Sequence, residues 1–493
     1  MSNEETEELA DLELRAEIDR SLRWPLLFFF TSGASWLLLS TVLGFLASIA
    51  LMFPHLFENI SMLQYGRLLP AFQNAIIYGW AIQVGIGVGY WLLGRLGRVP
   101  LKNSLGVLVG GHLWNGGVTF GILTILFGFG NSQQWLDFPA ALFPFLLVSY
   151  VVMMLGMVGM YASRRHREGF ITQGFVLTSL FWFPLIYLTA CVFIHLGSGP
   201  AVLKTVINSW FGGNLIYLVL GSMALGASHY FVSKTTGRPL HSQQLAQIGF
   251  WSFLIFGSWT GVSRYMGGPI PAWMPTLSSV AATLLVIPAV MILVNLLKTA
   301  GDRLGWASYS PSLRFTLFGM GAFVVTVVMG AFLSRFSTGA ELQFSHAWPA
   351  YELLAIYGFF SMTMFGAVYF IVPRLVGCEW PSGSLVRFHF WFSAYGTIGM
   401  VAFLFFAGMA QGHLQNIWSE NFLVSVERSR PYFASLAIGW TLITLSNLAF
   451  FFQLSLMFIR RGRRVGEGPT LIHKRPEDYF NDPLVGSDEA AKA

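Results

Sequence analysis

The segment "WFGGNLIYLVLGSMALGASHYFVSKTTGRPLHS" (Trp210–Ser242) decides the class of fold. From Trp210 to Val232 it contains no Asp, Glu, Lys or Arg, and the next basic residues are Lys234 and Arg238. About 20 apolar residues are enough for a helix to cross a bilayer, and basic residues gather on the cytosolic side of such helices. The segment therefore predicts a membrane-spanning helix followed by a short basic loop.

The rest of the chain repeats this pattern. Of its 493 residues, 55% are hydrophobic and only 11% are charged, whereas soluble domains carry about 25% charged residues. Apolar windows long enough to span a membrane occur near 24–53, 70–94, 104–128, 138–162, 170–196, 207–232, 244–262, 276–298, 313–334, 348–373, 388–411 and 431–459. The sequence thus predicts an all-α, polytopic membrane protein with twelve transmembrane helices joined by short loops.

The basic residues predict the orientation of the helices. With the N-terminus in the cytosol, 23 of the 29 Lys and Arg residues fall in cytosolic loops or tails. The six on the outer side are Arg67, Lys204, Arg264, Arg335, Arg428 and Arg430. We therefore expect both termini in the cytosol. The net charge of +6 comes from these loops, so we expect lipid as a neighbour and no nucleic-acid partner.

Three parts of the chain differ in composition. Residues 1–23 are acidic, have a helical pattern and lack the basic-then-apolar order of a cleaved signal peptide, so we expect a cytosolic N-terminal helix. Residues 24–460 contain the twelve apolar windows and form the membrane domain. Residues 461–493 are polar and are expected to be a cytosolic tail.

Few residues in the chain are suited to binding a metal. The two cysteines, Cys191 and Cys378, form no CxxC or CxxCH motif, and neither a zinc site nor a covalently attached haem is predicted. Of the ten histidines, only His112 is expected well inside a span. It is a possible interior functional residue, and the alternative is a neutral histidine hydrogen-bonded between helices.

Four strings in fixed order carry a family resemblance. They are "GRLLPAFQNAIIYGW" (66–80), the segment 210–242 quoted above, "GAVYFIVPRL" (366–375) and "FHFWFSAYGTIGMVAFLFFAGMAQG" (388–412). Together they resemble subunit I of heme-copper oxidases, in particular the cbb3-type (C-family) cytochrome c oxidase and its relative, nitric oxide reductase. The resemblance covers roughly residues 15–460, and it implies the twelve-helix bundle of that family in a bacterial-type inner membrane.

The family holds two haems and a copper ion with six histidines, and the resemblance indicates where those ligands would fall in this chain. The low-spin haem ligand corresponds to Phe72, and the first copper ligand to Gly213. The seventh span has a His-His pair in the family, and Gly261 and Val262 stand near it here. The tenth span has His-x-His, and Tyr351 and Leu353 stand at those positions. No histidine occupies any of the six, so we predict neither haem nor copper as a cofactor and no catalytic or metal-binding residue.

Two opposite charges lie next to the emptied positions. Glu352 falls inside the tenth span, where an unpaired carboxylate costs several kcal/mol. Arg264 stands at the outer end of the seventh span. We expect Arg264, Tyr265, Tyr351 and Glu352 to form a polar cluster where the family binds metals. We also expect aromatic side chains to fill the space that haem would occupy, since interiors pack densely.

Three functions remain open at this point. The favoured one is a non-catalytic subunit I homologue, a structural subunit of a respiratory membrane complex whose expected partners are other membrane subunits, with c-type cytochrome subunits as candidates among them. The second is an active terminal oxidase or nitric oxide reductase with unusual ligands. The third is a proton or small-solute transporter on the same fold. The family is an oxidoreductase, but without ligands we expect no enzymatic activity from this chain on its own.

Overall fold

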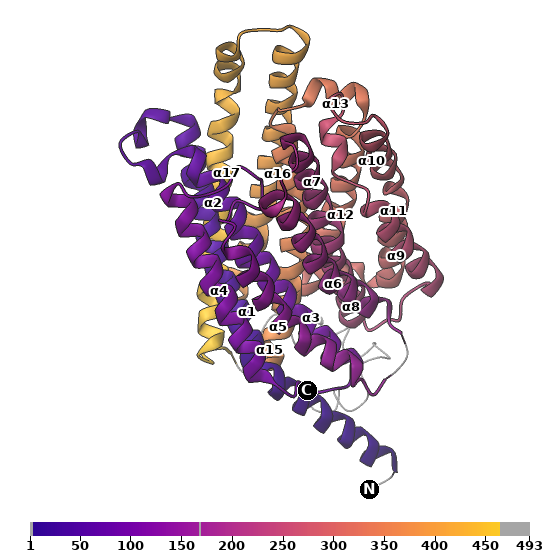
Figure 1. The fold of residues 1–493 in the computed structure, drawn as a ribbon. Helices are drawn as coiled ribbons and strands as arrows, with labels where there is room; N and C mark the ends of the chain where they lie inside the picture. The colour runs from indigo at the N-terminus through magenta and orange to yellow at the C-terminus, as the bar shows by residue number, and fades with distance from the viewer. Residues whose placement is uncertain (1–2, 167–168, 464–493) are drawn as a thin grey trace.

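The computed structural model describes residues 3–166 and 169–463, and the side chains from residue 10 onward. These residues form an elongated helical bundle, with the N-terminus at its lower end in Figure 1. We call this end the N-terminal end and the other the opposite end. Within the described residues the β structure is a single isolated bridge, Glu379–Arg463. The expected tail, 461–493, lies outside the described residues except for its first three.

The first half of the bundle contains five spans. Helix α1 (Asn3–Met52) runs without a break from the expected cytosolic helix into the first span. The short helices η1 (Pro54–Phe57) and η2 (Ser61–Leu63) lead to the second span, α2 (Tyr65–Asn74), η3 (Ala75–Ala81) and α3 (Ile82–Gly97). The next three are α4 (Ser104–Phe127), α5 (Leu142–Ala162), and α6 (Ile171–Cys191) with η4 (Val192–Leu196).

The second half contains seven more spans. The sixth span consists of α7 (Ala201–Asn214), η5 (Leu215–Gly221) and α8 (Ser222–Thr236), the seventh of α9 (Gln243–Gly257) with η6 (Val262–Tyr265), and the eighth of α10 (Trp273–Leu284), α11 (Val286–Ala300) and η7 (Gly301–Ser308). The ninth is α12 (Pro311–Leu333), followed by the short α13 (Phe336–Leu342), and the tenth consists of α14 (Ala347–Leu353), η8 (Leu354–Ser361) and α15 (Met362–Val376). The eleventh is α16 (Gly383–Gly412) with η9 (His413–Ile417), and the twelfth is α17 (Phe422–Phe458). Helices α16 and α17 pack along each other and project beyond the other spans at the opposite end (Figure 1).

Eleven of these spans are long and apolar enough to cross a membrane. The remaining one is α4, which has the length, but its glycines, His112 and Asn115 lower its mean hydropathy. The eighth span is interrupted between α10 and α11, because Pro288 lacks the N–H that would continue the helical hydrogen bonds. With α4 included, the bundle has the twelve spans predicted from the sequence.

Several spans that rise from the N-terminal end begin at a polar cap. The side chains of Asn103, Ser242, Ser310 and Ser382 each accept a hydrogen bond from a backbone N–H in the first turn of α4, α9, α12 and α16. Such caps satisfy donors that have no partner within the helix. They fix where each of these spans starts.

The second, sixth and tenth spans form the centre of the bundle. Each contains a π-helical segment at its middle, η3, η5 and η8 respectively. Their lower parts, α3, α8 and α15, pack against one another. Segments of this kind within a helix are frequently found at functional sites. The three central spans are also those in which the sequence placed most of the emptied ligand positions.

Candidate functional site: a polar cluster at the opposite end

All four residues of the predicted polar cluster line one small cavity. The cavity has a volume of about 50 Å³ and lies between the sixth, seventh and tenth spans, towards the opposite end. Arg264 and Tyr265 come from η6, and Tyr351 and Glu352 from α14. Another polar residue at its wall, Gln134, comes from the loop between α4 and α5.

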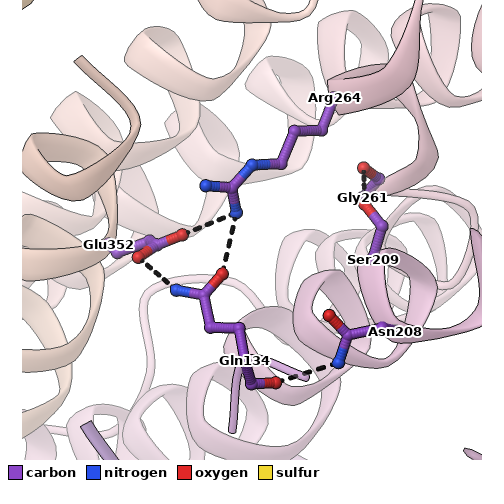
Figure 2. Close-up of polar contacts among 6 residues, drawn as sticks. All are labelled: Gln134, Asn208, Ser209, Gly261, Arg264 and Glu352. Carbon is purple, nitrogen blue, oxygen red and sulfur yellow. Dashed lines mark hydrogen bonds and ion pairs between the residues drawn. The ribbon is translucent and has the colours of Figure 1, made fainter. Parts of the chain in front are cut away.

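Arg264, Gln134 and Glu352 form a closed set of hydrogen bonds, shown in Figure 2. Nη1 of Arg264 lies 2.8 Å from Oε1 of Glu352 and 3.0 Å from Oε1 of Gln134. Nε2 of Gln134 donates to Oε2 of Glu352 at 2.7 Å. Both carboxylate oxygens are therefore bonded, which offsets the cost of burying a Glu352 side chain that is only 8% exposed.

Neighbouring side chains hold the cluster from two sides. The guanidinium of Arg264 lies over the ring of Trp348, 5.2 Å from its centroid, and the backbone carbonyl of Arg264 accepts a hydrogen bond from Gln343 at 3.1 Å. Tyr351 donates its hydroxyl hydrogen to the hydroxyl of Tyr217 at 3.0 Å, which links the tenth span to the sixth. Rigid surroundings of this kind lower the entropy cost of holding an ion pair in one geometry.

The loop that supplies Gln134 enters the bundle. We call residues 128–141 the insertion loop. Its residues Trp135 and Asp137 are 3% and 4% exposed, as buried as the core. The backbone carbonyl of Gln134 accepts from Asn208 at 2.9 Å, and that of Trp135 accepts from Tyr78 at 2.6 Å. These two bonds hold a loop whose Trp135 has a positive φ of 62°, a conformation unusual for an aromatic residue.

Asp137 is an ionisable group in this loop that is tied to the second span. Nδ2 of Asn74 donates to its Oδ2 at 2.6 Å. Burial raises the pKa of Asp137 to about 7, and the hydrogen bond from Asn74 acts in the opposite direction. Asp137 therefore titrates near neutral pH.

Gly213, the predicted counterpart of the family's first copper ligand, is closed in by main chain. A Cβ atom added at Gly213 would lie 2.6 Å from the carbonyl oxygen of Thr260, closer than real side chains approach. Gly261 has a φ of +107°, and a Cβ there would collide with the carbonyl oxygen of Ser209, while Val262 is buried beside it in η6. The sixth and seventh spans thus pack backbone to backbone, and a side chain at Gly213 has no room.

Phe72, the predicted counterpart of the low-spin haem ligand, borders a second, apolar cavity. It has a volume of about 120 Å³, and Phe72 and Leu353 both line it. The ring of Phe72 packs edge-on against Trp440, with 4.8 Å between centroids. The expectation that aromatic side chains fill this space is therefore only partly met, because a cavity remains beside them. Glu352 lines this cavity as well as the polar one.

The residues present do not fit haem or copper. Imidazole nitrogen is the donor that suits both metals, whereas Phe72, Gly213, Gly261, Val262 and Leu353 have no donor in their side chains. Across the described ranges 3–166 and 169–463, no three His, Cys, Asp or Glu side chains gather in a way that could hold a metal. We therefore derive no step through either cofactor.

The structure corrects the prediction for His112. Its side chain is exposed on the outer face of α4 rather than enclosed among the spans. Its Nδ1 lies 2.7 Å from the carbonyl oxygen of Leu108 in the same helix, and its ring stacks on Phe28 at 4.3 Å. The prediction failed because position along a span indicates depth in the membrane but not which face of the helix a residue occupies. His112 takes no part in either cavity.

Sequence reasoning missed three residues of the insertion loop, Gln134, Trp135 and Asp137. Their only local signal is an aspartate set between apolar residues in "QQWLDFP", at the edge of the predicted fourth span. That pattern indicates a buried carboxylate, but nothing in it identifies Asn74 or Glu352 as partners.

The fold and these central spans define a polytopic helical membrane protein. The family model "Cytochrome C and Quinol oxidase polypeptide I" matches residues 25–442, so the chain belongs to the heme-copper oxidase subunit I family. It is similar to "Cytochrome c oxidase subunit 1 homolog, bacteroid" of Bradyrhizobium diazoefficiens, at 22% identity over 474 residues, which is 91% of this chain and 84% of the relative.

Two further relatives carry similar names. "Cbb3-type cytochrome c oxidase subunit CcoN1" of Stutzerimonas stutzeri is 22% identical over 428 residues, covering 82% of this chain and 88% of that protein. "Cytochrome c oxidase subunit 1" of Rhodobacter capsulatus is 21% identical over 445 residues, covering 84% and 82%. The predicted resemblance to subunit I of cbb3-type oxidases is thus confirmed at the level of the family.

Proposed function

We propose that this protein is a non-catalytic subunit I homologue, which keeps the membrane bundle of the family and serves as a structural subunit of a respiratory membrane complex. The observation that carries the proposal is the Arg264–Gln134–Glu352 cluster. It joins the seventh and tenth spans, which the family joins through ligands to its metal site, by an ion pair and two amide hydrogen bonds. The closed backbone contact at Gly213 supports the same conclusion.

Partner subunits have a large surface on which to dock. Exposed apolar side chains cover the outer faces of α4, α9 and α16, among them Phe120, Trp251, Ile255, Trp391 and Tyr395. Lipid and other membrane subunits are the expected neighbours of such faces. By analogy with the family, those neighbours include c-type cytochrome subunits, in a bacterial inner membrane with both termini of this chain in the cytosol.

The transporter alternative is weakened by the geometry of Glu352. A carboxylate that carries protons must exchange them, but both oxygens of Glu352 already accept hydrogen bonds, one from Arg264 and one from Gln134. Proton release and uptake would have to break this pair at each step. We therefore do not propose proton transport through Glu352.

The test is purification of the full chain from its native membrane with its partners. The visible absorption spectrum and elemental analysis then give the haem and copper content of the separated chain, and mass spectrometry identifies the subunits purified with it. We expect less than one-tenth of a haem or copper per chain and a defined set of membrane subunits. A stoichiometric haem that stays with the separated chain would overturn the proposal in favour of an active oxidase or nitric oxide reductase.

A further inference from the structure

A third cavity, the largest of those described, lies at the N-terminal end of the bundle, away from the polar cluster at the opposite end. Its volume of about 530 Å³ is in the range of small-molecule sites. It is lined by the lower parts of α1, α3, α8 and α15, by the start of α6 and by the loop after α8. Six cationic side chains face it: Arg15, Arg95, Arg98, Lys234, Arg238 and Arg374.

Positive charge exceeds negative charge at this cavity. Asp11, the one carboxylate among its described lining residues, is shared between Arg15 and Arg98 at 2.6 Å and 3.3 Å. Asp19 pairs with Arg95 at 3.6 Å and Asp302 with Arg238 at 2.5 Å, and Glu379 interacts with Arg374. Lys234 has neither an ion pair nor a hydrogen bond within the described part of the chain. Even with all four carboxylates counted, the six cations leave a surplus of two.

Two residues that line this cavity, His229 and Arg95, each contain a buried nitrogen atom that has no partner in the described structure. His229 lines the cavity, is 1% exposed and has its Nδ1 2.7 Å from the carbonyl oxygen of Leu225. Nδ1 therefore carries the proton, and Nε2 is left as a buried acceptor without a donor. Nη1 of Arg95 is likewise buried without an acceptor among the described residues. Each such unpaired atom costs about 1–3 kcal/mol.

We propose that this cavity binds a ligand that carries a phosphate group. The phosphate would lie against Arg95, Lys234 and Arg374. Basic pockets between transmembrane helices are known to hold phosphate headgroups. An anionic polyol phospholipid and a soluble nucleotide share this chemistry. The site involves no residue of the polar cluster and does not depend on the function proposed above.

The experiment measures binding to the full chain, purified in a neutral detergent and stripped of lipid. The probes are short-chain phosphatidylglycerol, phosphatidylcholine of the same chain length, and ATP. We expect saturable binding of phosphatidylglycerol or ATP, with phosphatidylcholine at least tenfold weaker. Binding of the lipid alone identifies a headgroup site, and binding of ATP alone identifies a nucleotide site.

Variants place the binding at this cavity. Lys234→Gln should weaken binding about fivefold, because one cation near a phosphate contributes about that factor. Lys102→Gln makes the same charge change at an exposed residue of the same end that does not line the cavity, and should leave binding unchanged. If Lys234→Gln does not fold, Arg98→Gln, with a side chain 53% exposed, replaces it. Equal affinity for all three probes, or equal weakening by Lys102→Gln, would overturn the proposal.

Discussion

Nη1 of Arg264 lies 2.8 Å from Oε1 of Glu352, although the two residues are 88 positions apart in the chain. The side chain of Arg264 is 30% exposed and that of Glu352 is 8% exposed, so Arg264 reaches solvent while Glu352 is nearly buried. An ion pair at this depth holds two spans in register, but it adds stability only while both partners are present. This asymmetry leads to the first prediction.

Arg264→Gln should destabilise the protein more than Glu352→Gln. The first change leaves a nearly buried carboxylate without its cation, and breaking a buried pair in this way costs about 3–5 kcal/mol. The second leaves an arginine that still reaches solvent. The measurement is the thermal unfolding midpoint of the purified protein in detergent. Arg335→Gln, at an exposed arginine of the same end, is the control and should change little.

The double variant Arg264→Gln/Glu352→Gln separates pairing from general loss of charge. It should be more stable than Arg264→Gln alone, because no unpaired charge remains. Strictly additive effects of the two substitutions would show that the pair is not coupled energetically.

Gln134→Leu should lower the stability of the protein by removing the third member of the Arg264–Gln134–Glu352 cluster. The change removes the amide that bonds to both Arg264 and Glu352, which we expect to cost about 1–3 kcal/mol. Gln133→Leu makes the same substitution one residue earlier, where the side chain forms no hydrogen bond within the described structure. Equal unfolding midpoints for the two variants would count against a bridging role for Gln134.

The sequence predicts the spans well and the loop between α4 and α5 poorly, for a physical reason. Apolar runs of about 20 residues are a local property, so the twelve windows match the observed helices closely, including α12 (Pro311–Leu333) against 313–334. The insertion loop and the interruption of the eighth span are tertiary features. A polar loop that packs inward at Trp135 carries no periodic signal by which it could be recognised.

The residues of the candidate site were likewise predicted only in part from the sequence. The resemblance to a metal-binding family placed Arg264 and Glu352 near each other, because equivalent positions in that family converge on one cavity. It could not place Gln134, which lies in a loop outside the aligned motifs. The apolar pattern indicated the depth of His112 but not the face of α4 that it occupies, since the rotation of a helix depends on how its neighbours pack.

Gly213→Ala should destabilise the protein, whereas Gly116→Ala should not. The new methyl group at Gly213 would lie 2.6 Å from the carbonyl oxygen of Thr260, and overpacking of this kind costs about 1–3 kcal/mol. Nothing lies within 4 Å of a methyl group at Gly116, and alanine favours a helix. Unfolding midpoints compare the two. A Gly213→Ala variant as stable as the parent would mean that the sixth and seventh spans can separate.

The close contact between Gly213 and the carbonyl oxygen of Thr260 also predicts that a histidine introduced at position 213 will not provide a copper site. Gly213→His places a larger side chain against the same carbonyl group, so we expect poor folding and no bound copper by elemental analysis. Phe72→His replaces a residue that borders a cavity of about 120 Å³ and should fold. Stoichiometric copper in a folded Gly213→His variant would contradict the closed packing.

Asp137 should make stability depend on pH near neutrality. Its ordinary pKa is 3.8 and burial raises it to about 7, so between these values the folded state binds more protons than the unfolded state. Stability therefore falls as the pH rises through this window and is lowest above it.

Asp137→Asn keeps the shape of the side chain and removes its titration, so the variant should be more stable than the parent at pH 8, by up to roughly 4 kcal/mol. Thermal midpoints from pH 4 to pH 8 should fall for the parent and stay flatter for the variant, while Glu420→Gln, at an exposed carboxylate, should follow the parent. Parallel curves for Asp137→Asn and the parent would mean that Asp137 is already ionised throughout this range.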